Sequence, residues 1–323
     1  METIPTALEH SYPFDPSCGY GLEELLAVGS PDGPPDFSEF WSKTHQLACA
    51  VPLRLEKREI ESPSKDRRVW EVKFDSLGGI RIGAWVTEPR HLDPDAGGWV
   101  VGHGYGGRGE PAFDELFRGA PAIFFCVRGF NLSAYADIPD SFERHVLHGI
   151  ESPETYVHRG CVADIWAAAS ALVEMFPCAA KHLRYFGGSL GGGLGALALP
   201  WDGRFERAFL DVPSFGNHPL RLQFPGVGSG EQVRLYAVEH PDVLKALSYF
   251  DAATAARSIQ IPVFVAAAMF DPAVAPPGQF AVFNALPGLK ELFTWTSGHF
   301  STPAEPTEQA QLAACLVQWF GCP

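Results

Sequence analysis

The chain has 323 residues, of which 46% are hydrophobic and 19% charged, a composition typical of globular proteins that excludes a disordered or fibrous chain. Its formal net charge is −14 and its 24 lysines and arginines are scattered, so no basic surface for DNA, RNA or an anionic membrane is expected. This charge balance favours a neutral or cationic small molecule as the ligand.

The start of the chain and its cysteines both indicate an intracellular protein. The first ten residues, METIPTALEH, lack the basic and apolar segments of a signal peptide, and no later apolar run is long enough to cross a bilayer. The seven cysteines are an odd number and show no CxxC spacing. We therefore expect a cytoplasmic protein whose cysteines are reduced and buried.

Residues 1–60 read as an N-terminal extension that is rich in proline and glycine at its start. Within it, the segment 36–48 repeats apolar residues at helical spacing and is predicted to be a helix. Two runs with partial alternation of apolar and polar residues come next, separated by two glycines. They predict a hairpin with strands at 67–76 and 80–88.

The remainder of the chain alternates short apolar runs with helical stretches. The apolar runs show little alternation, which is typical of strands buried on both faces, and they lie at 98–104, 122–129, 183–189, 207–214, 262–271 and 290–299. The helical stretches lie at 152–176, 190–199, 276–286 and 305–320. This alternation predicts a mainly parallel sheet flanked by helices, in an α/β fold.

One segment, 215–248, interrupts the alternation of strands and helices with a run rich in glycine and proline. We interpret it as an insertion placed like a lid over the strand ends, near the active-site face. No internal repeat marks a second unit, so residues 1–323 are expected to form a single domain that includes the N-terminal extension.

A glycine-flanked serine stands between a predicted strand and a predicted helix, in the stretch YFGGSLGGG at 185–193. Strand, sharp turn and helix around Gly187-x-Ser189-x-Gly191 are the setting of a nucleophilic serine in α/β-hydrolases. Glycines relieve the steric collisions of such a tight turn. The alternative is an ordinary glycine-rich turn.

A serine nucleophile needs a histidine base and a carboxylate that orients it, in the chain order Ser, acid, His. Asp271 and His299 satisfy this order, and each follows a predicted buried strand. Asp211 and Asp251 are rival acids that lack the helix start at Pro276 and Pro277, so we rank them below Asp271. The other reading places Asp271 in a solvated turn and His299 in a surface loop.

The backbone N–H groups of Tyr105 and Leu190 are the predicted oxyanion-hole donors, since one follows an early strand and the other follows the serine. His103 is interpreted as a structural residue of the same loop. His145-x-x-His148 has a spacing that suits a metal, but no further ligand is evident, so a surface helix or loop is the better interpretation.

Several motifs along the chain resemble those of one family. They are HGYGG at 103–107, VRG at 127–129, GGSLGGG at 187–193, SYFD at 248–251, DxxxxPP at 271–277 and GHF at 298–300, with DFSEFW and SPETYVHRG upstream. Over nearly the whole length they resemble the acetyl xylan esterase and cephalosporin-C deacetylase family, carbohydrate esterase family seven.

The resemblance implies an α/β-hydrolase fold and hydrolysis of acetyl esters of small sugars or oligosaccharides without a metal or cofactor. It also implies a triad of Ser189, Asp271 and His299, with the oxyanion held by the N–H groups of Tyr105 and Leu190. Relatives in this family form ring-shaped hexamers, so a homo-oligomer is a possible assembly.

Three positions depart from the family's motifs RGQ, GxSQG and HE. Phe130, Leu190 and Phe300 stand where the family has a polar residue, each next to a predicted active-site element. Either the substrate pocket is drier, which would suit a more apolar ester, or the support behind it is repacked. Arg128, inside the first motif, would then lose its usual hydrogen-bond partners. Phe130, Phe300 and Pro213 are candidates for the pocket lining.

Two other classes stay open besides an esterase. A peptidase or amidase would use the same triad, but the sequence shows no separate domain that would gate peptides. A non-catalytic binding protein on a hydrolase scaffold would be expected to have lost a triad residue, and all three are present.

Overall fold

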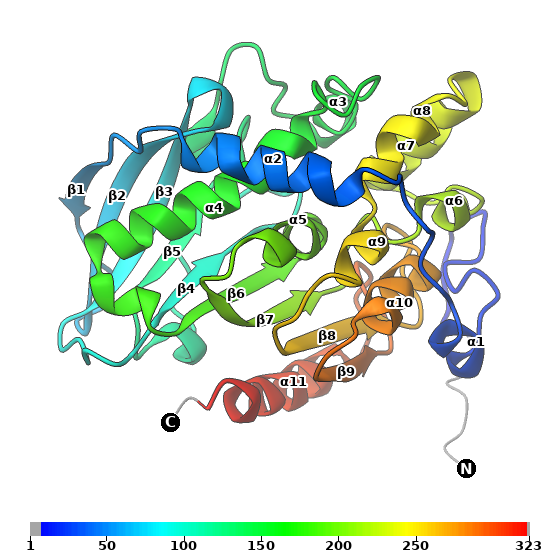
Figure 1. Ribbon diagram of the computed structural model, residues 1–323. Helices are drawn as coiled ribbons and strands as arrows, with labels where there is room; N and C mark the ends of the chain where they lie inside the picture. The colour runs from blue at the N-terminus through cyan, green and yellow to red at the C-terminus, as the bar shows by residue number, and fades with distance from the viewer. Residues whose placement is uncertain (1–7, 322–323) are drawn as a thin grey trace.

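The computed structural model describes residues 8–321. Its centre is a nine-stranded sheet in the order β1-β2-β3-β5-β4-β6-β7-β8-β9, with helices on both faces (Figure 1). The strands from β5 to β9 pair in parallel, whereas β1, β2 and β3 extend the sheet with antiparallel pairs. The predicted α/β class with a mainly parallel sheet is confirmed.

The antiparallel edge holds the predicted hairpin and one strand that sequence analysis missed. Strands β2 (Arg67–Ser76) and β3 (Ile80–Pro89) pair across a short turn, as expected. The missed strand is β1 (Glu56–Ile60), whose sequence EKREI is mostly charged and whose side chains are exposed except for the half-buried Ile60. An edge strand with both faces in water carries no hydrophobic pattern from which it could be recognised.

All six predicted buried strands are present. They are β4 (Gly98–Val101), β5 (Ala122–Phe125), β6 (Leu183–Gly188), β7 (Phe205–Asp211), β8 (Val263–Ala268) and β9 (Lys290–Trp295). Strands β4, β5 and β8 are buried at every position, because helices cover both of their faces. The carboxyl ends of these parallel strands meet at one edge of the sheet.

Each face of the sheet is covered by its own hydrophobic cluster. The face with the larger cluster packs against five helices, α2 (Phe37–Cys49), α4 (Val157–Met175), α5 (Leu190–Ala198), α9 (Ala252–Ala256) and α10 (Pro276–Ala285). The opposite face packs against α11 (Glu305–Phe320), which is red in Figure 1. The helix predicted at 152–176 begins later, at Val157.

The predicted insertion at 215–248 is largely helical. It contains α6 (His218–Arg221), α7 (Gly228–Glu239) and α8 (Val243–Leu247), and it packs near α3 (Phe142–His145). The short α1 (Leu22–Leu26) lies against α10. Residues from α6 and α7 reach the carboxyl ends of the parallel strands, where they line a cavity together with Ser189.

The N-terminal extension is anchored to the main fold by Trp41 of α2. This side chain is fully buried, and its Nε1 donates a hydrogen bond to the Tyr249 carbonyl oxygen (2.7 Å). Its ring packs edge-on against Trp166 and Phe250. Burial of so large a ring stabilises the attachment of α2 by about 2–3 kcal/mol.

Arg128 has several buried hydrogen-bond partners despite the altered motif around it. Its guanidinium pairs with the buried Asp164 carboxylate (Nη2 to Oδ1, 2.7 Å; Nε to Oδ2, 3.0 Å) and also donates to the Ser76 hydroxyl and the Leu77 carbonyl oxygen. It packs directly on Gly160 of α4, where a Cβ atom would overlap it. Arg128 is therefore a structural residue that joins β5 and the hairpin turn to α4.

The six described cysteines are free thiols, as predicted, but they are not uniformly buried. Cys126 and Cys161 are buried, whereas Cys49 is exposed near the end of α2. Cys322 lies outside the described residues. Among residues 8–321, no helix is both long and apolar enough to cross a bilayer.

The contact between Arg128 and Gly160 predicts an unusual effect of Gly160→Ala. Alanine inside a helix normally stabilises it by about 1 kcal/mol relative to glycine. Here the added methyl group displaces a buried ion pair, so we expect a loss of about 1–3 kcal/mol in the free energy of unfolding, measured in urea. The matched control, Glu174→Ala on the exposed side of the same helix, should change it by less than about 0.5 kcal/mol. An unchanged or raised stability of Gly160→Ala would contradict the packing described.

Candidate active site

Ser189 occupies a strained turn between β6 and α5. Its backbone angles are φ 51° and ψ −113°, outside the usual regions for a residue with a side chain. The turn is held because its N–H donates to the Asp211 carbonyl oxygen (2.9 Å) and its own carbonyl oxygen accepts from Gly193 and Ser214. A Cβ on Gly187 would lie 2.6 Å from the Gly191 carbonyl oxygen, which explains the flanking glycines.

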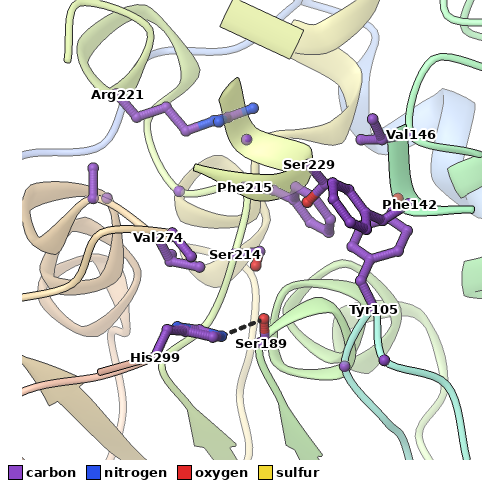
Figure 2. A pocket seen from close by; sticks show the side chains of 18 residues that line it. Tyr105, Phe142, Val146, Ser189, Ser214, Phe215, Arg221, Ser229, Val274 and His299 are labelled. Carbon is purple, nitrogen blue, oxygen red and sulfur yellow. Dashed lines mark hydrogen bonds between the residues drawn. The ribbon is translucent and has the colours of Figure 1, made fainter. Parts of the chain in front are cut away.

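The structure brings Ser189 together with the two other predicted triad residues. His299 follows β9, and its Nε2 lies 3.0 Å from the Ser189 Oγ, a contact drawn as the dashed line in Figure 2. Its Nδ1 lies 2.8 Å from Oδ2 of Asp271, which follows β8. A neutral imidazole that donates from Nδ1 to the carboxylate can accept the serine proton at Nε2.

Asp271 is almost completely buried and is held from both sides. Its Oδ1 accepts hydrogen bonds from the backbone N–H groups of Ala273 (2.8 Å) and Val274 (2.9 Å). Its Oδ2 accepts from Nε2 of Gln279 (3.0 Å) in addition to His299. These donors fix the carboxylate in the orientation in which it meets the imidazole.

Gln279, on α10, is a supporting residue that sequence analysis missed. Its side chain is fully buried, its Nε2 also donates to the Val274 carbonyl oxygen (2.7 Å), and its Oε1 accepts from the Ala268 N–H (2.8 Å). It thereby ties the end of β8 to the loop that carries Asp271. A glutamine in the first turns of a helix has no distinctive sequence pattern, so only the polar side chain in an apolar stretch could have drawn attention to it.

A second carboxylate lies near the imidazole. Asp211 ends β7, and its Oδ1 accepts a hydrogen bond from Nε1 of Trp295 (2.8 Å). Burial raises the pKa of Asp211 to about 6. Burial lowers the pKa of His299, but the hydrogen bond and charge of Asp271, together with the charge of Asp211, outweigh that effect and leave its pKa above the ordinary value.

The loop after β4 carries Tyr105 and His103, and both side chains are tied down. The Tyr105 hydroxyl lies 2.8 Å from Nε2 of His158 and 3.4 Å from Nδ1 of His145. His103 is buried, accepts from the Val127 N–H (2.9 Å) at Nε2 and has its Nδ1 2.7 Å from the Gly104 carbonyl oxygen, the structural contacts expected of it.

The surface interpretation of His145 is wrong. The residue is fully buried in α3, and its two ring nitrogens face the Arg128 carbonyl oxygen (3.0 Å) and the Tyr105 hydroxyl. Burial lowers the pKa of His145 to about 4 and that of His158 well below its ordinary value, so both imidazoles are neutral. Their role is to hold the loop that carries Tyr105.

The N–H groups of Tyr105 and Leu190 have no hydrogen-bond acceptor within residues 8–321. The Leu190 N–H belongs to the first residue of α5, where the helix dipole favours a negative charge. Tyr105 lines the same cavity as Ser189 and His299. These two N–H groups therefore lie on the loop after β4 and at the start of α5, and neither is used by another described residue.

Two hollows adjoin Ser189 and His299. One is a cavity of about 330 Å³, shown in Figure 2, whose walls are largely apolar and include Phe142, Val146, Phe215 and Val274. The other has a volume of about 740 Å³ and carries more polar groups, among them Arg108, Glu110, Asp211 and Glu305. We refer to them as the apolar cavity and the polar hollow.

The three predicted pocket residues lie at different places. Phe300 lines the polar hollow and packs at a tilt against Phe270 (ring centroids 5.2 Å apart). Phe130 instead packs behind Tyr105, with its ring 4.8 Å from that of His145. Pro213 contacts Gly192 of α5, and neither it nor Phe130 is among the described residues that line the two hollows.

The chain is similar to one protein family and to several solved structures. The model of the acetyl xylan esterase family matches residues 21–303. An acetyl xylan esterase from a Paenibacillus species superposes with a TM-score of 0.81 at 23% identity, over 92% of this chain and 99% of the other. One from a Thermoanaerobacterium species gives 0.77 at 19% identity, with the same coverage.

A more distant fold relative is an acylaminoacyl peptidase from Pyrococcus horikoshii. It gives a TM-score of 0.61 at 13% identity, over 84% of this chain but only 42% of its own. Likenesses at these identities show the α/β-hydrolase fold, whereas the family model, which covers most of the sequence, shows the lineage. The chain therefore belongs to the acetyl xylan esterase family and is a carboxylic ester hydrolase.

Proposed function

We propose that the chain is a serine esterase that removes short acyl groups, above all acetyl, from small sugars, xylo-oligosaccharides or cephalosporin-like compounds. The observation that carries this proposal is the continuous hydrogen-bonded row from Ser189 through His299 to the buried Asp271. Family membership supports the ester as the bond that is cleaved.

The proposed reaction is a two-step acyl transfer. Nε2 of His299 takes the proton of Ser189 as its Oγ attacks the ester carbonyl carbon, and Asp271 stabilises the imidazolium that forms. The N–H groups of Tyr105 and Leu190 bind the oxyanion, each contributing about 3 kcal/mol. His299 then protonates the departing alcohol. Water, activated by the same imidazole, hydrolyses the acyl-enzyme and releases the acid.

A carboxylesterase for more apolar aryl or alkyl esters is the second candidate. The largely apolar lining of the cavity beside Ser189 favours it. Phe130 and the buried Leu190 side chain, however, pack into the protein interior rather than into the cavity, so they support a repacked wall more than a drier pocket.

We expect Ser189→Ala to lower turnover about 10⁶-fold, because no other group replaces the nucleophile. The measurement is hydrolysis of 4-nitrophenyl acetate, together with labelling by a fluorophosphonate, which should be lost. Ser38→Ala, on the exposed face of α2, is the matched control and should behave like the wild type. Esterase activity that survives in Ser189→Ala would assign the nucleophile elsewhere.

The pH dependence should report His299. The reaction needs a neutral imidazole, so kcat/KM falls as the pH drops through a pKa that lies above the ordinary 6.5. Asp211→Asn removes a negative charge that favours the imidazolium, so the acidic limb should move to lower pH in the profile for a neutral ester. The exposed Asp242→Asn should leave the limb in place. An acidic limb that stays at the same pH or moves to higher pH in Asp211→Asn would contradict the electrostatic account.

A substrate panel should separate the two candidate functions. If the enzyme is a deacetylase of sugars, kcat/KM will be higher for acetylated xylo-oligosaccharides than for aryl esters once intrinsic leaving-group reactivity is corrected for. Preference for long-chain aryl esters would favour the carboxylesterase.

A further inference from the structure

The apolar cavity contains one cation that neither the family motifs nor the triad explains. Arg221 is the last residue of α6, and its partly exposed side chain lines the cavity that also exposes Ser189 and His299. In Figure 2 it extends along the side of the cavity opposite these two residues. An arginine in such a wall needs a partner, because an unpaired charge out of water is costly.

The described residues provide the guanidinium of Arg221 with only one hydrogen-bond acceptor. Nε of Arg221 donates to Nδ1 of His218 (3.1 Å). Burial lowers the pKa of His218 well below its ordinary value, and its Nε2 lies 3.2 Å from the Phe250 carbonyl oxygen. His218 is thus neutral, and it orients the guanidinium without balancing its charge.

The two terminal nitrogens of Arg221 have no acceptor within residues 8–321 and form no ion pair there. The charge of the buried Asp251 carboxylate acts on Arg221 from nearby, but no hydrogen bond joins the two side chains: Oδ2 of Asp251 accepts from the His218 N–H (2.6 Å) and Oδ1 from the Thr254 N–H (2.9 Å). The hydroxyl of the neighbouring Tyr156 donates to the Val146 carbonyl oxygen (3.0 Å). Four N–H donors of the guanidinium are left for a ligand.

One glycine borders the guanidinium. A Cβ on Gly230 of α7 would lie 3.3 Å from Nη1 of Arg221 and 3.1 Å from the Ala273 carbonyl oxygen, and Gly230 lines the same cavity. A side chain at this position would therefore contact Arg221, so the glycine leaves room beside the guanidinium.

We propose that Arg221 binds a carboxylate carried by the ester substrate. The planar guanidinium, held by His218 at one edge, presents parallel N–H donors that match the two oxygens of a carboxylate. The substrate class is then an ester with an anionic group, either on the acyl part, as in a half-ester of a dicarboxylic acid, or on the alcohol part, as in an O-acetylated hydroxy acid. This inference rests on the proposed esterase function.

The net charge of −14 does not oppose this assignment. Charges on the outer surface are screened over about 8–10 Å at physiological ionic strength, whereas a contact in a largely apolar cavity is screened little. The expectation of a neutral or cationic ligand applied to the molecule as a whole, while Arg221 determines the local field at one wall of the site.

The test uses two pairs of esters that differ only in charge. The acyl arm compares the mono-4-nitrophenyl ester of adipic acid with its primary amide, and the alcohol arm compares 3-acetoxybenzoate with 3-acetoxybenzamide. Values of kcat/KM are measured for the wild type, Arg221→Met, Arg221→Lys and the control Arg257→Met. Arg257 is exposed at the end of α9, away from the cavity lining.

We expect the wild type to prefer the carboxylate about 10- to 100-fold in one arm, the range of a charge-assisted hydrogen-bonded pair. The arm that shows the preference identifies the part of the substrate that carries the charge. Arg221→Met should abolish the preference, Arg221→Lys should keep part of it, and Arg257→Met should keep all of it. Equal or better hydrolysis of the amide in both arms, or a preference that survives in Arg221→Met, would overturn the proposal.

Calorimetric binding of benzoate and benzamide to the wild-type protein provides a readout that needs neither a variant nor turnover. Tighter binding of benzoate is expected, and equal or weaker binding would count against Arg221 even if Arg221→Met failed to fold. Ester hydrolysis without any carboxylate preference would refute this inference alone. Tighter benzoate binding without hydrolysis of any ester would refute the proposed function alone.

Discussion

The backbone of Ser189 holds a φ of 51°, a conformation that costs about 1–3 kcal/mol and lasts only where the surroundings enforce it. Three hydrogen bonds enforce it here. The Ser189 N–H donates to β7, and the Ser189 carbonyl oxygen accepts from the N–H groups of Gly193 and Ser214. Because these bonds join β6, β7 and α5, the hydroxyl is positioned only once the sheet has formed. The site is therefore a product of the whole fold, although one short turn carries its nucleophile.

Parallel strands bring distant residues together, since their carboxyl ends share one edge of the sheet. Asp271 follows β8 and His299 follows β9, the next strand, so a separation of 28 residues becomes a contact of 2.8 Å. Burial alone would leave the Asp271 carboxylate unstable, and the two backbone N–H groups and Gln279 offset that cost. Gln279 also binds the N–H of Ala268, so the geometry of the acid depends on how α10 packs against β8.

Sequence patterns predicted what depends on local order and failed where long-range packing decides. The six buried strands and the hairpin were recognisable because apolar residues are concentrated in them, and the serine turn because glycines surround Ser189. Strand β1 escaped because its charged residues stay exposed after folding. His145 was misplaced because its burial results from contacts with Arg128 and Tyr105, which lie 17 and 40 positions away and leave no local pattern.

The two hollows beside Ser189 differ in character, and this difference limits what net charge can say about a ligand. The polar hollow carries three carboxylates, Asp211, Glu110 and Glu305, and the cation Arg108, whereas the apolar cavity carries Arg221 in an otherwise largely apolar wall. An anionic group on a substrate is therefore attracted to the side of Arg221 rather than to the carboxylates of the polar hollow. Phe130 and Leu190 leave this arrangement intact, since their side chains are buried behind the wall and only Phe300 faces a hollow.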